Sequence, residues 1–344
     1  MKRLVLVVLA LALVFGLMTG CSKDEQASTD SRAAVEEKTV YRIKGGHANP
    51  ATHPYHIGLE KFGELLEEKS DGQIILDSFH SSQLGNERDL VDGLPLNTVQ
   101  AAVITSAPLS GFTDAYLIFD LPFIFEDVTE ARMVCDSDIG DEMLKSLEND
   151  GVVGLAFFEN GMRNITNSKR PIETPADMEG IKIRTMENPM HMEAFKAMGA
   201  DPTPMAFGEL FTALQQKAID AQENPYVVIY ANKFFEVQEY LSNTEHLYSP
   251  APLLISKAFY DSLPADLQAV VWEAAEEAKV AQRQSCDDQN SFLLDSLASE
   301  GMLINTPNKA PFVEATKAVY DKYVGEGKGL VTPEIFNAVQ DMLK

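Results

Sequence analysis

Two arginines stand where strand-like segments end, a position suited to binding an anion. Arg163 follows the apolar run Val152 to Phe158 after the short polar stretch Glu159-Asn160-Gly161, and Arg184 ends the run that begins at Ile181. In open α/β sheets, ligands bind outside the carboxyl ends of strands. The planar guanidinium group gives a carboxylate two parallel hydrogen bonds and keeps its charge. The pattern predicts a carboxylate site, whereas either arginine alone is more often a surface or ion-paired residue.

A third polar segment has the same character. It runs from Asp220 to Pro225 and carries Gln222, Glu223 and Asn224 directly before the proline that turns the chain. Three segments thus place polar side chains at the ends of apolar strands, and together they favour a binding site.

Motifs of catalysis or metal binding do not stand out in the sequence. No histidine belongs to an HExxH pair, and no cysteine has zinc-ligand spacing. The chain has no G-x-S-x-G elbow, no P-loop and no dinucleotide-binding glycine pattern. Paired carboxylates for acid–base chemistry stay open, because so acidic a chain offers many pairs and singles out none. We expect a binding protein without metal or cofactor, not an enzyme.

Short apolar segments alternate with stretches of helical periodicity, which predicts an α/β fold with central sheets flanked by helices. The expected strands are residues 41–44, 74–76, 101–104, 152–158 and 181–184. The expected helices are residues 55–69, 83–94, 130–150, 189–198 and 207–216. Residues 199–204, with two prolines, are expected to form a rigid loop.

One segment predicts an unusually long helix. From Pro264 to Ser299 neither proline nor glycine interrupts a helical pattern of apolar residues. Such a helix would be about 50 Å long at 1.5 Å per residue and could bridge two domains. Two ordinary helices broken near Asp287-Asp288 are the alternative.

The first residues predict export and a lipid anchor. Lys2 and Arg3 precede an uncharged apolar run from Leu4 to Gly20, which is typical of a signal peptide and too short to span a bilayer. The run stops at Cys21, as in bacterial lipoprotein signals, where the thiol is acylated after residues 1–20 are removed. A plain signal peptide and an uncleaved anchor are the alternatives. Residues 21–38 are polar and are expected to form a flexible tether.

Composition bounds the partners and the number of domains. The net charge of −24 repels nucleic acid and anionic lipid, so contact with a membrane is expected through the lipid anchor only. The roughly 300 residues after the tether are more than one core usually serves, so two domains are expected. Cys135 and Cys286 could pair in an oxidising compartment, but two separate buried thiols fit the sequence equally well.

Several short motifs, in order along nearly the whole mature chain, resemble the DctP-type substrate-binding proteins of tripartite ATP-independent periplasmic (TRAP) transporters. No single motif is decisive, but their order and spacing together are highly specific. The motifs are HPYH at 53–56, QLGNER at 83–88, DLPF at 120–123, NGMR at 160–163, TNSKR at 166–170, GIKIR at 180–184, PTP at 202–204 and QENP at 222–225.

This resemblance implies a periplasmic-binding-protein-like fold of two lobes. Each lobe has a central sheet flanked by helices, and crossover strands and a long helix join the two. Lobe I is expected to comprise residues 39–161 plus about 250–288, and lobe II residues 162–249 plus about 289–344.

The resemblance also implies roles for individual residues. Arg184 is expected to pair with the ligand carboxylate, Arg163 to assist, and Asn224 to hydrogen-bond near the same group. Residues expected at the variable, distal end of the ligand, or as an apolar wall in the case of Phe207, are His47, His53, Glu87, Thr105, Ser106 and Phe207.

The function expected from this resemblance is capture of a small organic acid by hinge closure and delivery to the membrane permease of a TRAP transporter. Polar distal residues favour a hexuronate or related sugar acid over a C4-dicarboxylate or another monocarboxylate or keto acid. The protein is expected to act as a monomer outside the cytoplasm. The remote alternatives are an exported hydrolase and a cation-binding surface lipoprotein.

Overall fold

The computed structural model describes residues 38–344 of the chain. The predicted signal peptide, the predicted acylation site at Cys21 and nearly all of the predicted tether therefore lie outside the described residues. Within the described range, none of the helices combines the length and the apolar character needed to cross a membrane.

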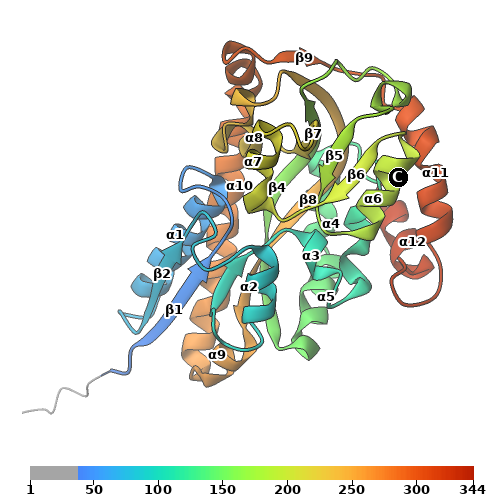
Figure 1. Cartoon of the computed structure of the whole chain (residues 1–344). Helices are drawn as coiled ribbons and strands as arrows, with labels where there is room; N and C mark the ends of the chain where they lie inside the picture. The colour runs from blue at the N-terminus through green and yellow to red at the C-terminus, as the bar shows by residue number, and fades with distance from the viewer. Residues whose placement is uncertain (1–37) are drawn as a thin grey trace, which may run out of the picture. The chain divides into compact units, whose positions relative to one another are not determined.

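The described residues form a mixed α/β fold around one continuous sheet, as Figure 1 shows. The strand order is β2-β1-β3-β8-β4-β7-β5-β6, and β9 pairs with β8. The strands are β1 (Tyr41–Gly46), β2 (Ile74–Phe79), β3 (Ala101–Val103), β4 (Val152–Asn167), β5 (Lys182–Thr185), β6 (Asp201–Pro204), β7 (Ala221–Asn224), β8 (Tyr240–Ser256) and β9 (Leu303–Asn305).

Helices flank this sheet, as the sequence predicts. The α-helices are α1 (Pro54–Lys69), α2 (Glu87–Gly93), α3 (Ser106–Leu109), α4 (Val128–Cys135), α5 (Asp138–Ser146), α6 (Pro189–Ala197), α7 (Leu210–Gln215), α8 (Tyr226–Ala231), α9 (Lys257–Ser262), α10 (Ala265–Ser299), α11 (Ala310–Tyr323) and α12 (Pro333–Met342). Short 3-10 helices are η1 (Asp114–Asp120), η2 (Leu147–Asp150), η3 (Pro175–Met178), η4 (Phe207–Glu209) and η5 (Phe234–Glu236).

The two longest strands, β4 and β8, run antiparallel through the centre of the sheet and confirm the predicted crossover. Their pairing extends from Val152 opposite Ser256 to Asn167 opposite Tyr240. At one end β8 also pairs with β3, and at the other end β4 also pairs with β7. The two strands therefore belong to both halves of the sheet.

The predicted end of a strand at Phe158 is wrong, because β4 continues to Asn167. Register shifts with β8 occur between Glu159 and Gly161 and again between Arg163 and Ile165. Gly161 has φ 118°, a backbone conformation that suits glycine. These irregularities keep the polar stretch in the sheet by absorbing extra residues, as bulges do.

The long bridging helix is also confirmed, since α10 is unbroken over 35 residues. It contacts α1 in the first half of the fold and α8 in the second. Leu267 and Val271 of α10 pack in the core beneath β1 and β3, whereas Leu293 and Leu297 pack in a separate core with α7 and α8. One rigid element therefore contributes to the cores of both halves.

The division into lobes remains a proposal. Separate cores lie around α1 and β3, and around β5 and α6. The C-terminal helices contact different cores: Phe312 of α11 packs with the second group, but Val339 of α12 packs in a cluster that contains Leu117 of η1.

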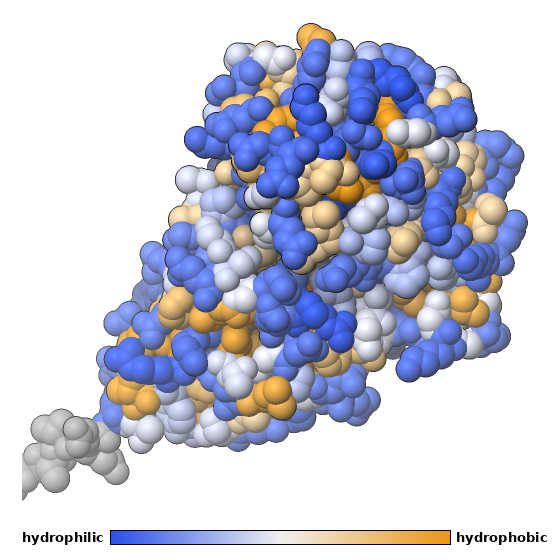
Figure 2. Space-filling model, viewed as in Figure 1, coloured by the Kyte–Doolittle hydropathy of each residue, from blue (hydrophilic) through white to orange (hydrophobic). Residues whose placement is uncertain are grey.

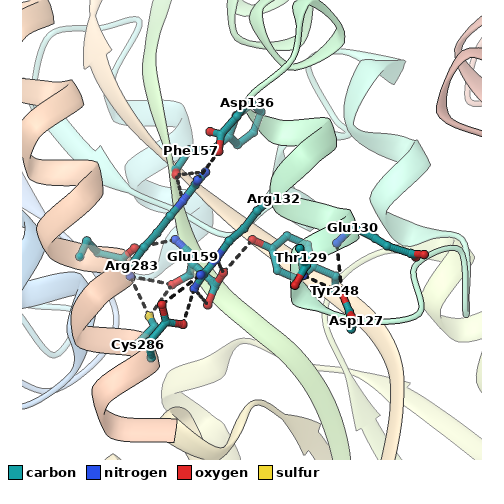
Figure 3. A network of polar contacts seen from close by, with 12 residues as sticks. Asp127, Thr129, Glu130, Arg132, Asp136, Phe157, Glu159, Tyr248, Arg283 and Cys286 are labelled. Carbon is teal, nitrogen blue, oxygen red and sulfur yellow. Dashed lines mark hydrogen bonds and ion pairs between the residues drawn. The ribbon is translucent and has the colours of Figure 1, made fainter. Parts of the chain in front are cut away.

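Three side-chain bridges fasten α10 to β4 and α4, close to the register shift at Glu159 (Figure 3). Arg132 of α4 donates to both carboxylate oxygens of Glu159, at 2.7 and 2.9 Å, and to both of Asp287 in α10, at 2.7 and 3.0 Å. Gln282 of α10 donates to the Glu159 carbonyl at 2.7 Å and accepts from its N–H at 2.8 Å. Arg283 donates to the Phe157 carbonyl and to Asp136.

Candidate ligand-binding site

Arg163 lies buried in β4, and its partners come from the neighbouring strand β7. Its Nε donates to Oε2 of Glu223 at 2.5 Å, and its Nη2 donates to Oε1 of the same residue at 2.8 Å. Nη2 also donates to Oδ1 of Asn224 at 3.1 Å. The remaining nitrogen, Nη1, is buried without a partner among residues 38–344. Arg163 is therefore neutralised on one side and keeps an N–H donor on the other.

Glu223 and His246 complete this buried group. His246 Nε2 lies 3.2 Å from Oε2 of Glu223, and its Nδ1 lies 2.8 Å from the Thr244 hydroxyl. Burial alone would raise the pKa of Glu223, but Arg163 and His246 reverse this and hold the pKa well below its usual range. Glu223 is thus an anion whose main task is to hold Arg163 in place.

Arg184 of β5 is a buried cation of a different kind. Its Nε donates to the Met205 carbonyl at 2.9 Å, and its guanidinium carbon lies 5.9 Å from the centroid of the Phe207 ring. No carboxylate of the described chain lies within ion-pair distance, and Nη1 has no partner there. Burial, and then Arg163, lower the pKa of Arg184 to about 10, while Glu223 and Glu87 raise it. The side chain therefore stays charged at neutral pH.

Glu87 and Thr105 face these arginines from the other half of the fold. Glu87 begins α2 and accepts hydrogen bonds from the Thr105 N–H at 2.8 Å and from its hydroxyl at 2.7 Å. The Thr105 hydroxyl also lies 3.8 Å from the sulfur of Met186, which follows β5. Burial raises the pKa of Glu87, while Thr105 and Arg184 lower it. Ser106 is buried next to Thr105, where α3 begins.

Residues from both halves line one small pocket. Glu87 lies on one side, and Arg184, Met186, Met205 and Phe207 lie on the other. Its volume is about 20 Å³, which is space for roughly one water molecule. An organic acid of several carbon atoms therefore enters only if the two sides move apart.

His47 and His53 meet around the ring of Tyr55. The ring centroid of Tyr55 lies 4.5 Å from that of His53 and 6.1 Å from that of His47, edge to face in both cases. His53 Nε2, His47 Nδ1 and the Tyr55 hydroxyl are buried, and none has a partner within the described part of the chain. Burial raises the pKa of Tyr55, Glu87 raises it further and Arg163 lowers it, so Tyr55 lies within electrostatic reach of the arginine site.

The predicted site residues thus fall into three groups, which are the two arginines with Asn224 and Phe207, Glu87 with Thr105 and Ser106, and the two histidines. Arg163 contacts Asn224, Arg184 contacts Phe207, and Glu87 contacts Thr105. His47 and His53 form the third side together with Tyr55. Sequence reasoning did not assign roles to Tyr55, Glu223, His246 or Met186. For Tyr55 and Glu223 a signal was present, because both stand inside motifs that identify the site.

The described residues show neither a metal-binding group nor a disulfide bond. Residues 38–344 contain no group of three or more histidine, cysteine, aspartate or glutamate side chains arranged to hold a metal ion. Cys135 and Cys286 are both buried and are not joined in a disulfide.

The chain matches the family model described as DctP, bacterial extracellular solute-binding protein, family 7, over residues 45–326. It is 38% identical over 279 residues to the 2,3-diketo-L-gulonate-binding periplasmic protein YiaO of Escherichia coli K12. That alignment covers 81% of this chain and 83% of the relative.

Solved structures that resemble this chain are also solute-binding proteins. A TRAP periplasmic solute-binding protein from Polaromonas sp. JS666, bound to D-erythronate, matches with a TM-score of 0.84 and 38% identity over 87% of this chain and 98% of that one. A TRAP periplasmic solute-binding protein from Shewanella oneidensis, with bound succinate, matches with a TM-score of 0.84 and 29% identity over 89% of this chain and 100% of that one.

Proposed function

This chain belongs to family 7 of the bacterial extracellular solute-binding proteins, and on that premise we propose that it captures a sugar acid and hands it to a TRAP permease. The observation that carries the proposal is the pair of buried arginines. Arg184 meets no carboxylate of the described residues within ion-pair distance, and Arg163 keeps an unpartnered Nη1. A buried charge is costly to leave unpaired, and a ligand carboxylate supplies the missing anion.

The hydrogen bonds that the two arginines can form with a ligand carboxylate are enough for micromolar affinity. A hydrogen bond to a charged group contributes about 1.5–3 kcal/mol when water is excluded. Two or three such bonds, together with contacts to hydroxyl groups, reach the roughly 8 kcal/mol of a micromolar complex. The halves of the fold close over the ligand because its carboxylate and its distal end contact opposite sides of the pocket.

A sugar acid suits the distal side better than a dicarboxylate does. Glu87 is ordered by Thr105 and lies at the pocket opposite Arg184. Its carboxylate accepts hydrogen bonds from hydroxyl groups and repels a second carboxylate. YiaO, which is named as a 2,3-diketo-L-gulonate-binding protein, and the Polaromonas structure, which is bound to D-erythronate, are both 38% identical to this chain.

The family places the protein outside the cytoplasm, where its partners are the ligand and the permease. We propose further that Cys21 carries a lipid anchor, that the protein is a monomer, and that residues 39–161 with about 250–288 and residues 162–249 with about 289–344 form the closing lobes. The polar residues from Ser22 to Lys38 would act as a tether between the lipid anchor and the two lobes.

A thermal-shift screen of the purified, ligand-free protein tests the proposal. A ligand that binds only the native state raises the melting temperature by mass action. We expect aldonates or uronates to raise it and succinate and fumarate to have a smaller effect. A shift with succinate or fumarate alone would assign the protein to the dicarboxylate binders, and turnover of a bound sugar acid would favour a hydrolase instead.

A further inference from the structure

Asp120, the last residue of η1, is a buried carboxylate whose two oxygens both contact the start of α6. Oδ2 accepts a hydrogen bond from Nδ2 of Asn188 at 2.7 Å, and Oδ1 lies 2.7 Å from Nε2 of His191. A buried carboxylate is costly unless its oxygens are hydrogen-bonded, and these two contacts meet that need. They also tie η1 to the helix that follows the strand of Arg184.

Asn188 contacts three separate elements. Its Oδ1 accepts the backbone N–H of Met190 at 2.8 Å and so caps α6. Its Nδ2 donates to Asp120 in η1 and, at 3.4 Å, to the Ala107 carbonyl in α3. The oxygen of this side chain therefore serves the helix, whereas the nitrogen joins the helix to η1 and α3.

Opening of the ligand pocket separates these contacts. Met186, two residues before Asn188, lines the pocket on one side. Pro108, directly after Ala107, lines it on the other side, where α3 contacts α2. Only residues 110–113 separate α3 from η1, and these two elements contact each other. When the sides move apart to admit a ligand, α3 and η1 therefore leave Asn188 together.

The packing around Asp120 excludes water from its carboxylate. Met190 and Ala194 of α6 lie in the same apolar core as Phe119, which directly precedes Asp120. In surroundings of low polarity a hydrogen bond to a carboxylate is stronger than in water. The contacts of Asp120 therefore stabilise the closed arrangement, and opening exchanges them for bonds to water.

We propose that Asp120, Asn188 and His191 form a clasp that is made only in the closed protein and slows the escape of a bound ligand. The proposal rests on the proposed function and adds a control over the lifetime of the complex. Other residues line the pocket, so the clasp acts on every ligand alike. Asp120 is a positioning residue, because it acts on the ligand only through the closure of the two sides.

Asn188→Ser separates the clasp from the helix cap. Serine caps a helix about as well as asparagine does, but its single hydroxyl cannot also donate to Asp120. We expect sugar acids to dissociate at least about tenfold faster from this variant, because a hydrogen bond to a charged group is lost from the closed state. The association rate should change by less than about twofold, since the clasp is not yet formed on encounter.

A matched control and a second ligand complete this experiment. Asn308→Ser is the control, because the exposed Asn308 likewise accepts a backbone N–H, that of Ala310, at the start of α11. Its rates should equal those of the unaltered protein. Two sugar acids that differ only at the end away from the carboxylate should lose affinity for Asn188→Ser by the same factor, within about twofold. Stopped-flow measurements of binding give both rates.

Three results would count against the clasp. Unchanged dissociation from a folded Asn188→Ser protein with a lower melting temperature would show a fixed contact, and carboxylate capture would still stand. A loss confined to one of the two sugar acids would place Asn188 in the ligand site itself. Absence of binding of any carboxylate to the unaltered protein would overturn the proposed function together with the clasp.

Hydrogen exchange of the unaltered protein decides the matter even if Asn188→Ser does not fold. The N–H groups of residues 190–192 are bonded to Asn188, so their exchange reports on the start of α6. A sugar acid should slow their exchange, and that of residues 117–121 around Asp120, at least about fivefold more than that of residues 313–316 in α11. Equal slowing in all three segments would contradict a clasp that forms on closure.

Discussion

A buried arginine without an ion-pair partner is unusual, and among the described residues the backbone holds Arg184 in that condition. Its Nε is used by the Met205 carbonyl, so the side chain cannot turn away from the pocket without losing that bond. Arg163 differs, because Glu223 and Asn224 occupy most of its donors. The two arginines therefore contribute unequally to binding, with Arg184 as the main anchor.

We expect Arg184→Ala to weaken sugar-acid binding by at least about 100-fold, the loss of one or two charge-assisted hydrogen bonds, in a protein that remains folded. Arg184→Lys should also bind poorly, since an ammonium group cannot form two parallel bonds to a carboxylate. Isothermal titration, with circular dichroism to check folding, measures both. Arg42→Lys, at an exposed position of β1 beside Asp77, should bind as the parent does. Unchanged affinity in folded Arg184→Ala would remove this residue from the site.

Some site residues could be predicted from the sequence, and others could not. The arginines could be found because each ends or follows an apolar run. The role of Glu223 as the partner of Arg163 could not, because the pairing depends on β7 lying beside β4 in register. The roles of His246 and Tyr55 depend in the same way on contacts between segments far apart in the chain.

The same limit holds for the secondary-structure elements. Local patterns predicted α1 and α10 well, because apolar periodicity and the absence of glycine and proline are local signals. The expected helix over 130–150 is instead split into α4, α5 and η2, with Ser137 capping α5. The expected loop over 199–204 contains the edge strand β6, where its prolines are tolerated. Crossover strands were expected from the family resemblance, but local patterns did not locate β8, since its polar first half resembles a loop until it is paired.

The bridges around Glu159 give a test of how α10 is attached. Glu159 is almost fully buried, and Arg132 is its ion-pair partner (Figure 3). Arg132→Met should lower the free energy of unfolding by about 3–5 kcal/mol, because a buried carboxylate is left unpaired. Adding Glu159→Gln should recover part of this loss, since the stranded charge is gone. Urea denaturation of the four proteins of this cycle measures the coupling. Additive effects of the two substitutions would argue against a direct interaction.

The irregular backbone of β4 at Gly161 gives a second prediction about the stability of the secondary-structure elements. Gly161 has φ 118°, where a side chain strains the backbone. Gly161→Ala should therefore destabilise the protein by about 1–3 kcal/mol. Gly325→Ala is a fair control, because its backbone is not in this region and its nearest neighbour, a methyl group of Leu330, is 3.6 Å from the added carbon. Melting curves compare the two; equal melting temperatures would show that the bend tolerates a side chain.

At the scale of the whole molecule, the acidic composition leaves the visible face in Figure 2 largely hydrophilic, with separate apolar patches. Against this background the histidines of the interior decide how stability depends on pH. His47, His53 and His246 are buried, and burial lowers the pKa of each below the ordinary 6.5. Between the folded and the unfolded pKa values the unfolded chain binds more protons. Stability is therefore full above pH 6.5 and falls as the pH drops below it.

We accordingly expect the free energy of unfolding to be at least about 2 kcal/mol lower at pH 5.5 than at pH 7.5, since each such histidine contributes up to about 1.4 kcal/mol per pH unit. Urea unfolding across this range provides the measurement. Glu87 has the opposite sign, because burial raises its pKa above the ordinary 4.5, so its contribution to stability falls as the pH rises from there. Equal stability at both pH values would mean that these histidines are already protonated in the folded protein.

The attachment of the chain to a membrane is testable without a structure of its first residues. Cys21→Ser removes the predicted acylation site, so we expect the protein to move from the membrane fraction to the soluble extracytoplasmic fraction. Cys135→Ser leaves the signal intact and should remain with the membrane. Metabolic labelling with a fatty acid, followed by detergent phase partition, distinguishes the two. Release of the unaltered protein would favour a plain signal peptide.

The bridging helix has a mechanical consequence. Sharp kinks in helices arise at proline, glycine or inserted groups, and α10 contains neither proline nor glycine. Its two ends pack in different cores, so a change in angle between them must be taken up as gentle curvature along its length or as sliding over α1 and α8. The helix thus bends elastically along its whole length, like a leaf spring, and has no single hinge point. If α10 is unstrained in the open protein, ligand binding strains the helix on closure, and relief of that strain on opening helps to release the ligand.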